Sequence, residues 1–237
     1  MADSLNLDQH TSHRFNEELE DVRARLLEMG GLVEEQCRKA LKALTKGNLE
    51  LAIEVANSDY RINEMEVEIN ARCMDILALR QPAATDLRVV VAIIRMTADL
   101  ERIGDEAEKI GRFAQTLAER RDAGAFRGDP KHLGKLAIAV LRGALDAFAR
   151  LDVSAAIETA AQDPEIDQEF ESVTRLLISH MMEQPAAVKS LLRVNWCARA
   201  LERIGDHAVN LCEEVIFLVK GSDVRHLSLK EVQDRFL

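Results

Sequence analysis

The hydrophobic positions of this 237-residue chain recur with the spacing of α-helices. In six stretches, apolar residues alternate spacings of four and three, which places them along one narrow side of a helix. The most regular stretch runs from Val89 to Leu117, and the stretch from Val194 to Leu218 repeats its rhythm. A narrow apolar stripe is typical of helices that pack nearly parallel to one another. The pattern therefore predicts an all-α protein with six long helices.

An internal repeat accompanies this rhythm. The block Glu101–Asp105, with the sequence ERIGD, returns as Glu202–Asp206, and Gln81–Ala84 returns as Gln184–Ala187. A repeat at a fixed spacing indicates that one structural unit has been duplicated. Each copy contains three of the six helical stretches, so the sequence predicts two three-helix bundles in tandem.

The boundary between the two copies is predicted in a charged, glycine-containing segment. The first repeat is expected to comprise residues 1–122 and the second residues 123–237. Proline stands between helical stretches or at the start of one, as its missing N–H and fixed φ require. Whether the two bundles lie side by side or end to end is left open by the sequence.

Composition narrows the fold and the partners further. Gly (11), Pro (4) and aromatic residues (4%) are too scarce for a large β-sheet protein, which needs turn formers and strand formers. The net charge of −10 repels phosphodiester backbones, so nucleic acid is an unfavourable partner and basic protein surfaces are favoured. The sequence shows neither a secretory signal nor a membrane span, and its four cysteines form no CxxC pair. We therefore expect a soluble, cytoplasmic protein.

The repeated ERIGD block carries residues that a helical bundle does not need. Glu101 and Asp105, like Glu202 and Asp206, fall off the apolar stripe and are expected on one exposed helix face. Like charges four residues apart cost a few tenths of a kcal/mol, and the glycine between them costs up to about 1 kcal/mol relative to alanine. The same unfavourable choice made twice suggests that a bound group compensates for it.

A metal ion is the expected compensating group. Carboxylate oxygens favour hard or borderline cations such as magnesium, manganese, calcium or iron. A second acidic pair with the same spacing, Asp163 and Asp167, lies at the start of a neighbouring helical stretch, and Asp59 with Asn63 is its weaker counterpart. If these helices are neighbours, one acidic site forms in each half of the chain.

Simpler interpretations of these acidic residues stay open. Asp163 precedes a proline and could cap a helix, and Asp59 occupies the matching place. Glu101 and Asp105 could form an ordinary solvated face, with Lys109 four residues after Asp105 as a counter-ion.

Motifs for catalysis are absent from the sequence. It contains no Glu-x-x-His pair, as ferritin-like di-iron bundles require, no phosphate loop and no GxSxG. His207 follows Asp206, but adjacent residues on a helix point about 100° apart, so His207 is predicted to be a surface residue. The chain is not expected to be an enzyme, although a carboxylate-bound metal enzyme or a metal-storage bundle is the alternative to a regulatory protein.

The chain resembles the PhoU family of phosphate-uptake regulators. The resemblance rests on several segments spread over nearly the whole chain: the doubled ERIGD block, Phe15–Leu19, Met29–Glu34, Asp86–Arg88 and Leu218–His226. It implies two three-helix bundles, often as a homodimer, in a cytoplasmic negative regulator of the phosphate-starvation response. Such regulators link the phosphate ABC transporter ATPase to a sensor histidine kinase, and so lie at the membrane only through these partners.

The resemblance also implies which residues bind metal. The acidic motifs of the family, which can bind iron or other metal ions on the surface, fall on these positions: Glu101, Asp105, Glu202, Asp206, Asp163, Asp167 and Asp59. Asn63 departs from the acidic pattern, which predicts a weaker site in the first half.

Overall fold

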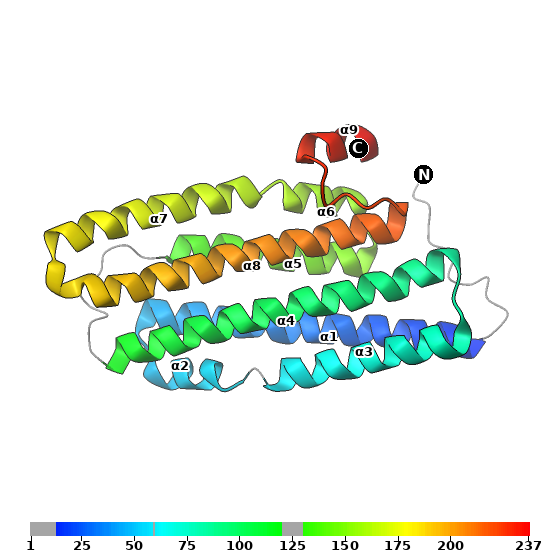
Figure 1. Cartoon of the computed structure of the whole chain (residues 1–237), viewed down its shortest axis with the longest axis horizontal. Coiled ribbons are helices and arrows are strands. Elements are labelled where there is room, and N and C mark those ends of the chain that lie inside the picture. Colours follow the sequence, from blue (N-terminus) through cyan, green and yellow to red (C-terminus); the bar gives the residue numbers. More distant parts are fainter. Residues whose placement is uncertain (1–12, 59, 120–129) are drawn as a thin grey trace.

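A computed structural model describes residues 13–58, 60–119 and 130–237 of the chain. In these residues the α-helices are α1 (His13–Lys46), α2 (Leu49–Ala56), α3 (Tyr60–Arg80), α4 (Ala84–Glu119), α5 (Lys131–Arg150), α6 (Val153–Ala160), α7 (Asp163–Glu183), α8 (Val188–Lys220) and α9 (Leu229–Phe236), with a short 3-10 helix at Pro185–Ala187 (Figure 1). The all-α prediction is confirmed, and six of these helices are long. The short helices α2, α6 and α9 add to the six that were predicted.

Matching turns separate α1 from α2 and α5 from α6. Asn48 and Asp152 cap the short helices, and each side chain accepts a hydrogen bond of 3.0 Å from the backbone N–H three residues on. The residue before each cap adopts a left-handed conformation, Gly47 with φ 60° and Leu151 with φ 53°. A left-handed residue followed by an N-cap ends one helix and starts the next within a tight turn.

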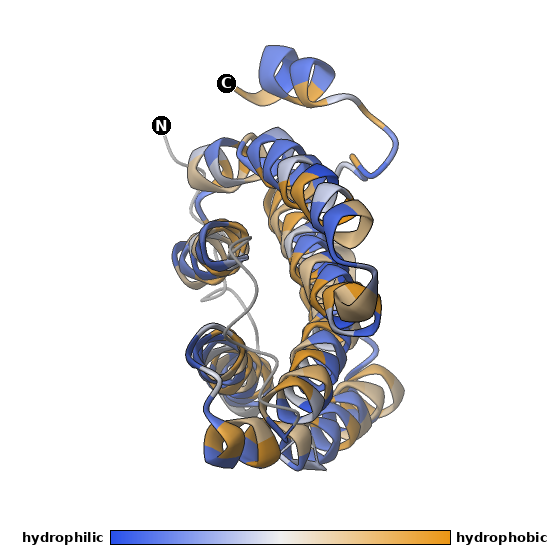
Figure 2. Ribbon diagram, turned by 90° about the vertical axis from the view of Figure 1, so that its left-hand side faces the viewer, coloured by the Kyte–Doolittle hydropathy of each residue, from blue (hydrophilic) through white to orange (hydrophobic). Residues whose placement is uncertain are grey.

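The two halves of the chain lie side by side. The centre of the molecule consists of α1, α4, α8 and α5, each packed against the next, and α5 returns to contact α1. Helices α2 and α3 pack on α4, while α6 and α7 pack on α8 (Figure 1). Seen along the helices, the long helices form two layers (Figure 2). The apolar stripes predicted from the sequence meet in the interior, where Leu26, Met96 and Ile103 are fully buried.

Two glycines allow α1 and α5 to approach closely. A Cβ atom at Gly30 would lie 2.5 Å from Cδ2 of Leu145, and a Cβ atom at Gly134 would collide with the side chain of Leu41. Each pair is the duplicate of the other, because Gly134 and Leu145 are the repeat counterparts of Gly30 and Leu41. The pairing also makes α1 and α5 antiparallel.

The predicted boundary between residues 122 and 123 lies outside the described residues. No helix in the described part of the chain has the length and apolar character needed to span a membrane.

Candidate functional site

The second half of the chain brings its two acidic pairs together. Helix α7 packs on α8 with Ile166 fully buried between them. A Cβ atom at Gly205 would lie 2.8 Å from Cδ1 of Ile166, so the glycine of the ERIGD block makes room for α7. This close packing places Asp163 and Asp167, one turn before and just after Ile166, beside the pair on α8. We call Asp163, Asp167, Glu202 and Asp206 the carboxylate cluster.

The carboxylates of this cluster repel one another. Burial, followed by the charges of Asp167 and Asp206, raises the pKa of Asp163 to about 6. Burial and then Asp206 raise the pKa of Glu202, although Arg199 counteracts this shift. Burial and Asp167 likewise raise the pKa of Asp206. A positive ion beside the cluster would therefore relieve an unfavourable interaction that the folded chain contains.

Two oxygens of the cluster are buried and unsatisfied. Oδ1 of Asp163 and Oε2 of Glu202 have no hydrogen-bond partner, whereas Oε1 of Glu202 accepts a bond of 2.7 Å from Nη1 of Arg199. A buried carboxylate oxygen without a donor is costly unless a cation or water satisfies it. The oxygens fit a hard cation in their chemistry. They do not form a complete shell, because no three His, Cys, Asp or Glu side chains of the described residues converge as ligands.

The structure corrects two interpretations of these residues. Asp163 is the first residue of α7 and not its cap; Gln162 precedes the helix, and no side chain makes a capping hydrogen bond. The acidic face is also less exposed than expected, because Glu202 is only 7% exposed, although Asp206 is exposed.

The first half of the chain is less complete. Glu101 and Asp105 lie half-buried on α4, and Asn63 stands on α3, which packs on α4. Asp59 lies outside the described residues. Lys109 does not serve Asp105 as a counter-ion, because its Nζ bonds Oε1 of Glu106 at 3.0 Å. The solvated-face interpretation therefore loses the ion pair that supported it.

Helices α4 and α8 are joined by a series of polar contacts, which we call the polar ladder. The sequence did not predict these contacts. Arg95 meets Glu214 at 3.4 Å, and Asp99 accepts hydrogen bonds from Asn210 at 3.2 Å and shares one with His207 at 3.0 Å. His207 is thus not a surface residue, since its side chain is 12% exposed.

The ladder continues along the two helices. Nε of Arg203 lies 3.2 Å from Oε1 of Glu106, and Phe113 packs on Trp196 with 5.3 Å between ring centroids. The arginine of the second ERIGD block therefore joins the two halves of the chain. The buried carboxylates of the ladder, such as Glu106 at 4% exposure, are paired across the two halves, which fixes the register of α4 on α8.

Together, the fold and the site define a class of duplicated, all-α proteins in which the third long helix of each half carries an acidic pair. Comparison with known proteins places the chain within this class. The model of the PhoU domain matches residues 26–114 and 131–215. The chain belongs to the PhoU family.

Relatives and solved structures agree with this assignment. The chain is 47% identical over 232 residues to the "Phosphate-specific transport system accessory protein PhoU homolog" of Pseudomonas putida, covering 98% of this chain and 91% of the relative. It is 42% identical to the accessory protein PhoU of Escherichia coli, covering 97% and 95%. The crystal structure of PhoU from Pseudomonas aeruginosa superimposes with a TM-score of 0.81 at 45% identity, covering 88% of this chain and 100% of that one.

Proposed function

We propose that this chain is an accessory regulator of phosphate-specific transport. The observation that carries the proposal is its 42% to 47% identity, over nearly the full length, to proteins named for that role. A regulator of this kind works through surfaces that bind partners. The long helices of the two layers supply such surfaces on a rigid body.

The proposed action is negative regulation of the phosphate-starvation response. In this proposal the chain acts in the cytoplasm as a homodimer, and reaches the membrane by binding the phosphate transporter ATPase and a sensor histidine kinase. When phosphate is plentiful, this link holds the kinase in its repressing state. The net charge of −10 supports docking on basic surfaces of these partners.

Metal binding is the second part of the proposal. Asp163, Asp167, Glu202 and Asp206 would hold an iron, manganese or magnesium ion, and Glu101, Asp105 and Asp59 would hold one more weakly. The two unsatisfied buried oxygens and the raised pKa values of the cluster support this assignment. The ion would supply positive charge that neutralises the cluster and could present a docking surface to a carboxylate of a partner.

A reporter of the phosphate-starvation response tests the proposal in cells that lack the chain. Wild type should restore repression in high phosphate, and Glu202→Gln/Asp206→Asn should not. The control variant, Glu165→Gln/Glu171→Gln, removes the same charge from exposed positions of α7 outside the cluster and should repress normally. A wild-type chain that leaves the reporter unchanged would overturn the regulatory role.

Two measurements test the partners and the metal. Tagged chain recovered from cells grown with and without phosphate should carry the transporter ATPase and the kinase in phosphate-dependent amounts. Elemental analysis should find metal in wild type and less in the cluster variant. Many ions per chain, or oxygen consumption, would favour the alternative of a metal store or carboxylate-bound metal enzyme.

A further inference from the structure

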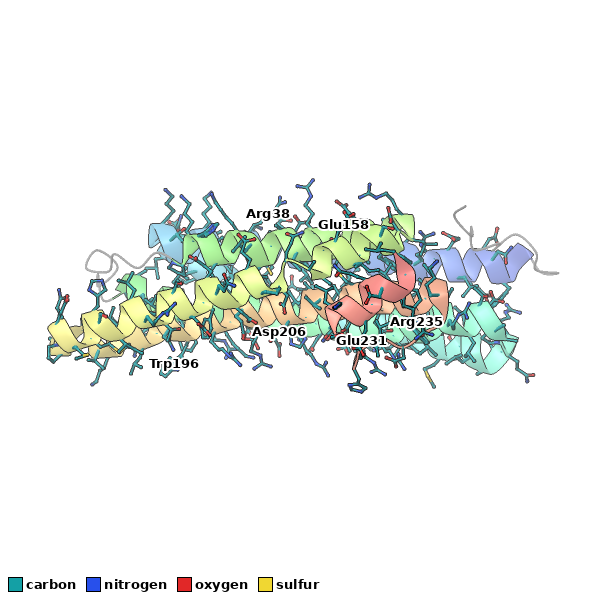
Figure 3. The ribbon with its side chains drawn as sticks, turned by 90° about the horizontal axis from the view of Figure 1, so that it is seen from above. Arg38, Glu158, Trp196, Asp206, Glu231 and Arg235 are labelled. Atoms are coloured by element: carbon teal, nitrogen blue, oxygen red, sulfur yellow. The ribbon has the colours of Figure 1, made fainter. Side chains whose placement is uncertain are left out.

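A basic groove runs between α1 and α5, on a different face of the molecule from Trp196 and the end of the polar ladder. Its volume is about 460 Å³, and cationic residues surround it: Arg38, Lys42, Lys46, Lys131, Lys135 and Arg142. Among the residues that the structure describes, no acidic residue lines it, although acidic residues outnumber basic ones by 41 to 31 in the whole chain. Figure 3 shows Arg38 and Trp196 at opposite edges of the molecule.

Most of these cations are not neutralised within the described part of the chain. Arg38 pairs with Glu34 on its own helix. Lys42, Lys46, Lys135 and Arg142 are exposed, and none of the described carboxylates forms an ion pair with them. Like charges gathered without counter-ions repel one another, so an anionic partner in the groove would relieve the repulsion.

The duplication provides an internal comparison. The α1–α5 contact repeats at its other end, where the repeat counterparts of Lys42, Ile138 and Ala139 are Asp146, Glu34 and Glu35. The same backbone arrangement thus carries acids at one end and a lysine with apolar residues at the other. The arginines recur at the other end, since the counterparts of Arg38, Lys46 and Arg142 are Arg142, Arg150 and Arg38. Lys42, Lys131 and Lys135 have no basic counterpart there, so the lysines and the lack of acids distinguish this end from the other.

The form of the groove indicates the kind of occupant. Two neighbouring antiparallel helices present a trough into which a third helix can pack by ridges and grooves. Leu41, Ile138 and Ala139 line the trough with apolar surface, and the cations stand around them. The lining on α5 spans Lys131 to Arg142, which at about 1.5 Å per residue is about 16 Å, or three turns of a partner helix. A fully charged polyanion would leave the apolar residues unmatched, and a flat lipid surface would not fill a trough.

We infer that this groove binds an acidic amphipathic helix of a partner protein. The apolar side of that helix packs on Leu41, Ile138 and Ala139, and its carboxylates meet the lysines and arginines around them. The inference goes beyond the proposed function, because it requires neither metal nor phosphate. The charges are also reversed relative to the docking proposed above. There the negatively charged chain binds basic surfaces of its partners, whereas here the partner supplies the negative charge.

A synthetic peptide tests the inference by fluorescence anisotropy on the full chain. The labelled peptide spans about three helical turns, with leucines at helical spacing on one side and glutamates elsewhere. A matched peptide of the same composition has its leucines scattered. The patterned peptide should bind at least about tenfold more tightly than the scattered one, and binding should weaken with salt.

Variants locate the binding surface. Lys42→Glu/Lys135→Glu should weaken binding of the patterned peptide by about tenfold or more, and Ile138→Ser should weaken it as well. Lys189→Glu/Lys220→Glu makes the same change in net charge at exposed positions of α8 and should bind as wild type does. Circular dichroism establishes that each variant is folded.

Several results would overturn the inference. Equal binding of both peptides would mean that charge alone is recognised, and equal loss in both lysine pairs would mean that the groove is not the site. Two other anions are tested in the same way: vesicles of phosphatidylglycerol and long-chain polyphosphate. If one of them binds through Lys42 and Lys135 and the patterned peptide does not bind, the groove is a site for that anion and not for an acidic helix. None of these outcomes bears on the phosphate reporter, so the failure of one proposal is distinguishable from the failure of the other.

Discussion

Replacing Asp163 by asparagine should have opposite effects on stability with and without metal. In the metal-free chain, burial and the neighbouring carboxylates raise the pKa of Asp163 from 3.8 to about 6. The folded state therefore holds this proton more tightly than the unfolded state. The free energy of unfolding falls as the pH rises from 3.8 to about 6, and the full cost of the charged carboxylate is present above that pH. The neutral amide removes this cost.

The magnitude follows from the pKa. The change from 3.8 to about 6 corresponds to about 3 kcal/mol at full effect, at 1.36 kcal/mol per pKa unit. Because Asp163 is only half-buried, solvent screening reduces the figure to about 1–2 kcal/mol. At pH 8 with a chelator, Asp163→Asn should raise the free energy of unfolding by that amount. At a pH below the unfolded pKa, the substitution should have no such effect.

Added metal should reverse the order of stability of wild type and Asp163→Asn. A metal ion at about 100 times its dissociation constant stabilises the folded state by about 2.7 kcal/mol, and the asparagine side chain would deprive the ion of a charged oxygen ligand. Wild type should therefore be the more stable protein in excess manganese. Urea unfolding followed by circular dichroism, at pH 8 with chelator or with manganese, measures both differences.

A matched control separates metal binding from relief of charge. Burial and Glu214 raise the pKa of Glu213 to about 7, but Glu213 lies outside the carboxylate cluster. Glu213→Gln should stabilise the chain under both conditions. Two results would refute the reasoning about the cluster. One is that Asp163→Asn destabilises the protein at pH 8 in the presence of chelator, and the other is that manganese stabilises Asp163→Asn as much as it stabilises wild type.

Three further predictions concern the rest of the molecule. The free energy of unfolding of the metal-free chain should fall as the pH rises from 4.5 to about 7, because Glu213 holds its proton more tightly in the folded state than in the unfolded state. In a series of urea titrations at different pH values, Glu213→Gln should make this fall smaller. Gly134→Ala should lower the unfolding free energy by up to about 2 kcal/mol in thermal melts, because the collision of the new methyl group with Leu41 costs about 1–3 kcal/mol and the helix propensity of alanine returns up to about 1 kcal/mol. A raised melting temperature would contradict the close packing of α1 on α5. Asp99→Ala should lower the free energy of unfolding by about 1–3 kcal/mol, because His207 and Asn210 on α8 lose their acceptor. The control Arg102→Ala, at an exposed position, should lower it by less than about 0.5 kcal/mol. Equal losses in urea unfolding would show that the polar ladder contributes little to stability.

The long helices were predictable because their apolar stripes extend over many turns. From Val89 to Leu117 the pattern is too regular to fit any other structure, and the structure follows it. The breaks at Asn48 and Asp152 were harder to predict, because a single capping residue is a weak signal inside an otherwise continuous helical sequence. The relative placement of the bundles could not be predicted, since helical periodicity does not specify which helices of the two halves become neighbours.

The candidate site was predictable in part for similar reasons. Spacing alone identifies Glu202 and Asp206 as neighbours on one helix, and the repeat connects them with Asp163 and Asp167. Burial of Glu202 depends on how other helices pack around α8, which the sequence does not reveal. The contact of His207 with Asp99 joins residues 108 positions apart, so no local pattern contains it. The basic groove could not be predicted from the net charge, because the net charge is a sum over all faces of the molecule and does not show where cations gather.

The reciprocal glycine contacts have a consequence for the assembly of the molecule. Gly30 receives Leu145 while Gly134 receives Leu41, which is the relation found in a two-fold homodimer, where each subunit contributes the same surface. The interior of this chain is thus built like an isologous interface whose two subunits have been joined into one polypeptide. Separately expressed halves therefore carry complementary surfaces and should reassemble with each other.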